Sequence, residues 1–195
     1  RHVAANALHN LGYTVALQGD LAGARKIELR SLRAFESLGD LRKIAHAHWY
    51  LGKIELRDQR PEVALREIEA AIPLFERSDH RELLLLQPTR VDALIALGRA
   101  DEALAISTEA LATFRAGNTS GGELDYLVAH AEALIAVARP GEARALIDEA
   151  EARLTSYLGR LAQAGTFDET LRRNYILHVP VVRRALELHE QLRSP

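Results

Sequence analysis

Cysteine is absent from this 195-residue sequence, and so is methionine. A chain without thiols forms no disulfide, no thiolate metal site and no cysteine nucleophile. The lack of cysteine is compatible with a cytoplasmic protein, and cytoplasmic is the location we expect. Because the chain starts at Arg1 and contains no methionine, we also expect it to be a piece of a longer polypeptide.

An excess of charge of one sign is lacking as well. The chain carries 25 basic and 27 acidic side chains, which leaves a net charge of −2. A balance so close to zero gives no electrostatic footprint for nucleic acid or for an anionic membrane. The longest leucine run is Leu83 to Leu86, far short of the roughly 18 apolar residues that span a bilayer. We therefore expect neither nucleic acid nor a membrane among the partners.

The sequence does contain a repeat, which three columns of residues define. Alanines recur at intervals of 40, 39 and 40 residues, and each is followed seven residues later by a small residue and eleven residues later by a large apolar one. The anchor alanines are Ala24, Ala64, Ala103 and Ala143, the small column is Ser31, Ala71, Ala110 and Ala150, and the large column is Phe35, Phe75, Phe114 and Leu154. Three columns at one spacing predict stacked helical repeats, each burying its apolar face on its neighbours.

Each repeat is interpreted as two helices with local start and stop signals. Asp20 is expected to cap the helix that follows it, and Gly39 to end that helix in a left-handed conformation. Pro61 suits a first turn, where a missing N–H costs nothing. Pro73 and Pro88 fall inside helical segments, so we expect a kink or a break at each.

These patterns predict an all-α fold, a right-handed α-α superhelix of antiparallel helix pairs. We expect a single domain over residues 1–195. Its repeats span about 1–39, 40–79, 80–118 and 119–163, and a capping helix pair covers 168–193. A loop is expected at 118–122, and a break at 164–166 after a long helix from Pro140 to Gln163.

Two Leu-Gly pairs carry a resemblance to a known family. Leu11-Gly12 and Leu51-Gly52 each stand so that the glycine precedes an anchor alanine by twelve residues. With the small residue seven positions further on, this pattern resembles tetratricopeptide repeats. The usual period of that family is about 34 residues. The longer period here resembles the C-terminal repeats of large bacterial signalling proteins, which follow an ATPase, kinase or cyclase module.

The sequence departs from the family pattern at two places. Arg90-Val91 stands where the third repeat should have Leu-Gly, and Glu55 stands where the family prefers an apolar residue. These two departures put the geometry of the third repeat in question. The segment from Arg172 to Arg184, in contrast, again resembles the end of such bacterial repeat regions.

The resemblance implies a binding groove lined by the first helix of each pair. Carried over position by position, it gives a set that combines aromatic, basic, amide and acidic side chains. The set is Asn6, His9, Tyr13, His46, Trp49, Lys53, Arg57, Asp92, Asp125 and Glu132. Such a groove suits an extended peptide, with aromatic anchors and donors for its carboxylates. Alternatively, Trp49 and Tyr13 pack between helices.

No pattern points to catalysis, to a metal or to a cofactor. The eight histidines include no His-Glu-x-x-His run, and His46 and His48 point to different faces of a helix. We interpret the histidines, and the acidic stretch around Asp148 and Glu151, as solvated surface. Gly121-Gly122 lacks the Lys-Ser/Thr of a phosphate loop. The chain is therefore predicted not to be an enzyme.

The expected function is a non-catalytic scaffold or regulatory module that binds a peptide or a partner surface. The partner could be another domain of the same polypeptide. The alternative is a repeat domain that senses a small-molecule effector for a transcriptional or kinase regulator. A homo-oligomer through the N-terminal repeat is a further hypothesis, with fraying of the first helix as the alternative. The apolar residues of the first helix exceed what one partner helix covers: Val3, Ala4, Ala7, Leu8, Leu11 and Val15.

Overall fold

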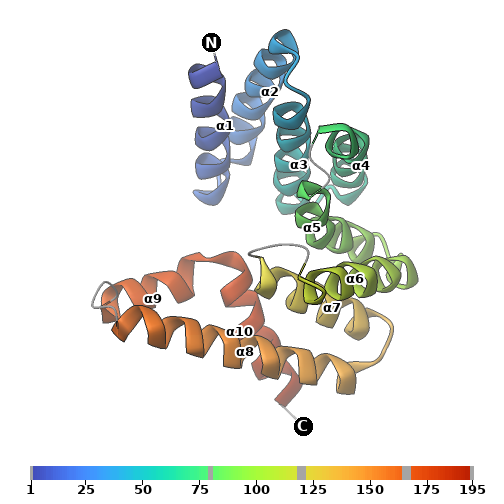
Figure 1. The fold of residues 1–195 in the computed structure, drawn as a ribbon, viewed down its shortest axis with the longest axis vertical. Coiled ribbons are helices and arrows are strands. Elements are labelled where there is room, and N and C mark those ends of the chain that lie inside the picture. The colour runs from blue at the N-terminus through green and yellow to red at the C-terminus, as the bar shows by residue number, and fades with distance from the viewer. Residues whose placement is uncertain (1, 79–80, 118–121, 164–167, 194–195) are drawn as a thin grey trace. The chain divides into compact units, whose positions relative to one another are not determined.

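The computed structural model describes residues 2–78, 81–117, 122–163 and 168–193, and these form ten helices and no strand (Figure 1). The helices follow one another as sequential antiparallel pairs, so the all-α prediction is confirmed. Their bounds are α1 His2–Leu17, α2 Leu21–Leu38, α3 Leu41–Arg57, α4 Pro61–Ser78, α5 Glu82–Ala96, α6 Ala100–Arg115, α7 Glu123–Ala136, α8 Pro140–Gln163, α9 Glu169–His178 and α10 Pro180–Arg193.

The chain divides into two compact units, which we call unit one, residues 1–99, and unit two, residues 100–195. Unit one contains α1 to α5 and unit two contains α6 to α10. The boundary falls within the repeat expected at 80–118, between its two helices. The single domain over 1–195 and its superhelical stacking stay predictions. Of the loop expected at 118–122 only Gly122 lies among the described residues, and the break expected at 164–166 lies outside them.

Local signals start and end the helices as their residue types predict. The Asp20 carboxylate accepts a hydrogen bond of 2.8 Å from the backbone N–H of Gly23, and Asp40 and Asp168 cap α3 and α9 in the same way. Gly39 ends α2 with φ of 66°, a left-handed conformation that glycine adopts without steric cost. The capping predicted for Asp20 and the stop predicted at Gly39 are confirmed.

Of the kink or break expected at each internal proline, the break is wrong, and a kink stays a prediction. Helix α4 continues through Pro73, and α5 continues through Pro88. Each ring removes one donor from the helical ladder. Pro73 and Glu69 are both exposed, so water can bind the Glu69 carbonyl that loses its donor. Pro88 is half-buried in α5. Helix α5 packs on both α3 and α4, and this packing holds the helix together although Pro88 lacks an N–H donor.

Small residues at the anchor columns let the two helices of a repeat approach closely. All four anchor alanines are fully buried. A Cβ placed on Gly52 would lie 2.7 Å from Cγ1 of Ile68 and 3.3 Å from the carbonyl oxygen of Ala64. Gly12 approaches Glu28 and Ala24 in the same way. The Leu-Gly pattern therefore marks the point where α1 packs on α2 and α3 packs on α4.

Large apolar residues fill the space between repeats within each unit. In unit one, Phe35 packs with Leu32 of its own helix and with Leu51 of α3. Phe75 is equally buried, and Phe114 in unit two is half-buried and stacks on Tyr126 with ring centroids 4.9 Å apart. Helix α10 completes the core of unit two, where its Ala185 and Leu188 pack with residues of α7 and α8.

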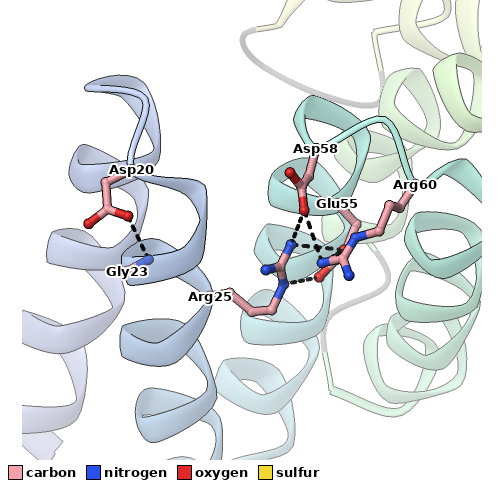
Figure 2. Close-up of polar contacts among 6 residues, drawn as sticks. All are labelled: Asp20, Gly23, Arg25, Glu55, Asp58 and Arg60. Carbon is pink, nitrogen blue, oxygen red and sulfur yellow. Dashed lines mark hydrogen bonds and ion pairs between the residues drawn. The ribbon is translucent and has the colours of Figure 1, made fainter.

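Glu55 is a buried charge in an otherwise apolar position, and its charged neighbours explain how it is accommodated (Figure 2). Its carboxylate lies 2.5 Å from Nε of Arg25 on α2 and 2.6 Å from Nη2 of Arg60. Asp58 pairs with both guanidinium groups, at 2.7 and 3.1 Å. These pairs raise the pKa of Arg25, chiefly through its hydrogen bond to Glu55. The departure from the family pattern at Glu55 thus coincides with an ion-pair network joining the first two repeats.

Candidate functional site

Five side chains of α1 and α3 gather in unit one, and we call them the aromatic–basic cluster: Tyr13, Trp49, Tyr50, Lys53 and Arg57. The ring centroids of Tyr13 and Tyr50 are 4.9 Å apart in an edge-to-face arrangement, and those of Trp49 and Tyr50 are 5.8 Å apart. Four of the five come from the set expected to line a groove. Tyr50 is the addition that the family positions did not provide.

Two cations of the cluster lie over its aromatic rings. Nζ of Lys53 is 4.2 Å from the Trp49 ring centroid and 5.3 Å from that of Tyr50. The guanidinium carbon of Arg57 is 5.9 Å from the Tyr13 centroid. Cation–π contact of this kind restrains a long basic side chain that carries several N–H donors suited to an anion. Lys53 and Arg57 are both half-buried, so less conformational entropy remains to be lost when they bind a ligand.

Trp49 takes part in the cluster mainly from within the core. It is only 8% exposed, and its indole N–H donates a 2.9 Å hydrogen bond to the hydroxyl of Thr89 on α5. A buried indole needs such a partner. The structure thus agrees with the alternative in which Trp49 packs between helices. The exposed part of the cluster is formed by the half-buried Tyr13, Tyr50, Lys53 and Arg57.

Two histidines of the expected set lie behind the aromatic rings. His9 is buried, and its Nδ1 is 2.6 Å from Oε1 of Glu28 on α2. The ring of His9 also contacts Tyr50, with centroids 4.3 Å apart. His46 packs edge-to-face on Phe75, and burial, followed by the charge of Lys43, lowers its pKa to about 4. Both rings support the cluster from inside the repeat pair.

The interpretation of the histidines as solvated surface is wrong for most of those whose side chains are described. His9 and His189 are buried, and His46, His48 and His130 are half-buried. Each of these five lies near an acidic or hydroxyl group on another helix, such as Glu67 for His48 or Ser107 for His130. The sequence pattern missed these partners because they come from a different helix of the stack.

The remaining members of the expected set are more dispersed. Asn6 is half-buried on α1, and Asp92 is exposed on α5. Asp125 and Glu132 lie on α7 in unit two, where the Glu132 carboxylate pairs with Nε of Arg184 on α10 at 2.5 Å. Glu132 therefore contributes to the attachment of the last helix. Among the described residues, no helix is long and apolar enough to cross a membrane.

Comparison with known proteins gives a fold but no sequence family. No family profile matches the chain, and no curated protein matches it by sequence. Several solved structures are similar, and two of them hold nearly identical TPR-like repeats assigned to a kinesin light chain of Podosopora anserina. The first, a point-substituted form, is 18% identical, with a TM-score of 0.64 over 96% of this chain and 92% of that one. The second is 16% identical, with a TM-score of 0.65 over 99% and 95%.

These structures share paired helices with this chain. Their sequence identity to it is so low that the similarity shows the fold alone. Two features of this chain point to the same fold. Its four anchor alanines are buried, and paired helices approach each other closely at Gly12 and Gly52. The chain has a TPR-like repeat fold.

Proposed function

We propose that this chain is a non-catalytic protein-binding module that holds an acidic peptide segment on the aromatic–basic cluster. The observation that carries the proposal is the placement of Lys53 and Arg57 over the rings of Tyr13, Trp49 and Tyr50. Held cations offer charge-assisted hydrogen bonds to carboxylates. The neighbouring tyrosines add apolar area and hydroxyl groups, which is the composition of many peptide-binding hot spots.

The fold supports the same proposal, because repeats of this type generally bind protein partners. A peptide that lies along α1 and α3 would meet Tyr13 and Tyr50 side by side, with Lys53 and Arg57 one helical turn apart on α3. The spacing of those two cations suits carboxylates on neighbouring turns of a helix or on alternate residues of an extended segment.

The test measures binding of acidic, neutral and basic peptide libraries to the full chain. We expect acidic peptides to bind, with an affinity that falls as salt rises, because exposed charges are screened. Lys53→Gln and Arg57→Gln should each weaken binding by roughly fivefold to tenfold, or about 1 kcal/mol. Lys26→Gln and Arg33→Gln remove exposed cations of α2 and serve as matched controls. Equal affinity for basic peptides, or equal losses in the control variants, would contradict the proposal.

Trp49 is unsuitable as the test residue in this experiment. Its substitution removes the hydrogen bond to Thr89 and opens a cavity between α3 and α5, so lost binding would accompany lost stability. Tyr13→Ala probes the aromatic contact instead, because Tyr13 is half-buried. A thermal-shift screen against metabolites addresses the alternative of effector sensing, and a metabolite that competes with acidic peptides would favour that alternative.

The wider context is part of the proposal. We propose a cytoplasmic regulatory region of a larger bacterial signalling protein, in which the acidic segment can belong to another domain of the same polypeptide. The period of about 40 residues supports this setting through its resemblance to such proteins. Expression of the chain together with its neighbouring domains, followed by crosslinking at Lys53, would identify an internal partner.

A further inference from the structure

We propose that Asp148, Glu151 and His189 form a binding site for a divalent transition-metal cation of the Zn²⁺ class in unit two. Asp148 and Glu151 lie one turn apart on α8, and His189 lies on α10, which packs against α8. One ligand atom from each residue lies within 4.8 Å of the other two. Ligand atoms around bound Zn²⁺ are roughly 3 to 4 Å apart, so small side-chain rotations bring the three into range.

The burial of His189 is a second observation that points to a ligand. The residue is only 8% exposed, and its Nδ1 is a buried atom without a hydrogen-bond partner among the described residues. Buried polar atoms nearly always have a partner, so a lone one calls for an explanation. A lone pair on a neutral imidazole nitrogen is a typical ligand for a transition metal.

The two carboxylates are placed around the imidazole in a way that suits coordination. Nδ1 of His189 is 3.5 Å from Oδ1 of Asp148, and Nε2 is 3.2 Å from Oε2 of Glu151. Either nitrogen can therefore be the imidazole ligand, with one carboxylate already beside it. The other carboxylate reaches the cation by a side-chain rotation, since the three ligand atoms lie within 4.8 Å of one another.

The donor set selects a class of metal. One imidazole nitrogen with two carboxylates suits Zn²⁺, Co²⁺ or Mn²⁺, whereas Mg²⁺ and Ca²⁺ prefer ligands that are all oxygen. Two carboxylates also balance the charge of a divalent cation. Asp148 is exposed and Glu151 is half-buried, so the cation can enter from solvent and keep water in its remaining positions.

A cation at this position would fasten α10 to α8. From the sequence, Asp148 and Glu151 are interpreted as a solvated acidic face and no metal is predicted. The sequence does not reveal this site because the third ligand, His189, lies on another helix far along the chain. This site is independent of the peptide-binding proposal, since all of its residues belong to unit two. It is a structural site, with no substrate or reaction assigned to it.

The test is calorimetric titration of the full, tag-free chain with ZnCl₂, with MgCl₂ as the comparison cation. We expect Zn²⁺ to bind with one-to-one stoichiometry and Mg²⁺ to bind at least a hundredfold more weakly. Asp148→Asn and Glu151→Gln should each weaken Zn²⁺ binding at least tenfold. Zn²⁺ should raise the melting temperature of the unaltered chain and of the control variant, and much less that of these two variants. The control is Glu187→Gln, which removes one carboxylate from α10 outside the proposed site. The ion pairs of Glu187 to Arg183 and Arg184 are both 3.6 Å long.

A spectroscopic measurement identifies the imidazole directly. Bound Co²⁺ should give visible d–d absorption and shift the ring ¹⁵N resonances of His189, and both signals should be lost in Asp148→Asn. These two carboxylate variants change partly accessible residues, so a circular dichroism spectrum can verify that each remains helical. Zn²⁺ binding that is equal in all variants, or lost equally in Glu187→Gln, would overturn the proposal, and so would the absence of Zn²⁺ binding at millimolar concentration.

Discussion

Arg25 of α2 and Glu55 of α3 form a bidentate ion pair, with Nε 2.5 Å from Oε1 and Nη2 3.2 Å from Oε2. The pair joins the first repeat to the second. At the repeat spacing, the positions that correspond to Glu55 hold Val15, Leu94 and Leu134, and two that correspond to Arg25 hold Leu65 and Leu104. An ion pair has therefore taken the place of an apolar contact at this one junction.

We predict that Arg25→Leu destabilises the protein and that Arg25→Leu with Glu55→Leu largely restores it. Loss of one partner leaves a buried carboxylate held only by Arg60, at an expected cost of about 1 to 3 kcal/mol, since Arg25 and Arg60 are partly open to solvent. A double-mutant cycle in urea measures the coupling. Strict additivity of the two single changes would show that the pair contributes nothing.

The close approach of α3 to α4 predicts an unusual response to alanine. Gly52→Ala should cost about 1 to 3 kcal/mol, because its Cβ would lie 2.7 Å from Cγ1 of Ile68. Gly159→Ala is the matched control, since nothing lies within 4 Å of the added methyl group on α8. Helix propensity alone should then make Gly159→Ala stabilising by roughly 0.5 to 1 kcal/mol. Equal effects of the two substitutions in thermal unfolding would contradict the packing argument.

Acidification should destabilise unit one through His46. Its pKa of about 4 lies below the 6.5 of an unfolded histidine, so the unfolded chain binds the proton more readily between those values. Stability is therefore full above pH 6.5 and falls as the pH drops toward 4, by roughly 2 kcal/mol at pH 5. Urea unfolding at about pH 7.5 and pH 5 measures the change. His46→Leu should lose most of this dependence, whereas His2→Leu, on an exposed ring, should keep it.

Glu28, which is buried against His9, changes stability with pH in the opposite direction. Burial raises the pKa of Glu28, and the hydrogen bond to His9 offsets part of the rise. The folded chain thus holds a proton on Glu28 more readily than the unfolded chain does. The contribution of Glu28 to stability consequently falls as the pH rises through 4.5 toward the raised pKa.

A repeat-based substitution tests this pair. The corresponding residues in the fourth repeat are Val128 and Ile147, so His9→Val with Glu28→Ile installs a combination the fold already uses. We expect the double variant to be at least as stable as the unaltered chain near neutral pH, and His9→Val alone to cost about 3 kcal/mol. Chemical unfolding of the three proteins decides, and a double variant less stable than His9→Val would contradict this account.

Apolar exposure on α1 predicts that the chain self-associates through this helix or that the helix frays. Val3 is 83% exposed and Leu11 is 49% exposed, and the two residues lie near one face of the helix. Sedimentation should show association that increases with concentration and weakens when both are changed to glutamate. Leu171→Glu removes an exposed leucine of α9 and should have no effect. A monomer in which the amides of α1 exchange as slowly as those of α3 would contradict the prediction.

Periodic and local features were predictable from the sequence, and contacts between distant residues were not. The anchor alanines, the cap at Asp20 and the stop at Gly39 depend on spacing or on the nearest turn, and each appears where it was expected. The continuity of α5 through Pro88 was missed because local propensity says nothing about surrounding packing. The partners of Trp49, His9 and His189 were missed for a similar reason, since each lies on another helix. Tyr50 was missed because the family positions on α3 pass over it.

Trp49 is the only tryptophan in the sequence, and its indole lies in unit one against Thr89 and beneath Nζ of Lys53. Intrinsic tryptophan fluorescence therefore reports on residues 1–99 and is blind to the rest of the chain, whereas circular dichroism records every helix. Melting curves recorded by both signals would coincide if the two units unfold together and separate if they do not. The nearby ammonium group also makes the emission sensitive to any anion that draws Lys53 away, so the protein carries its own optical reporter for ligand binding.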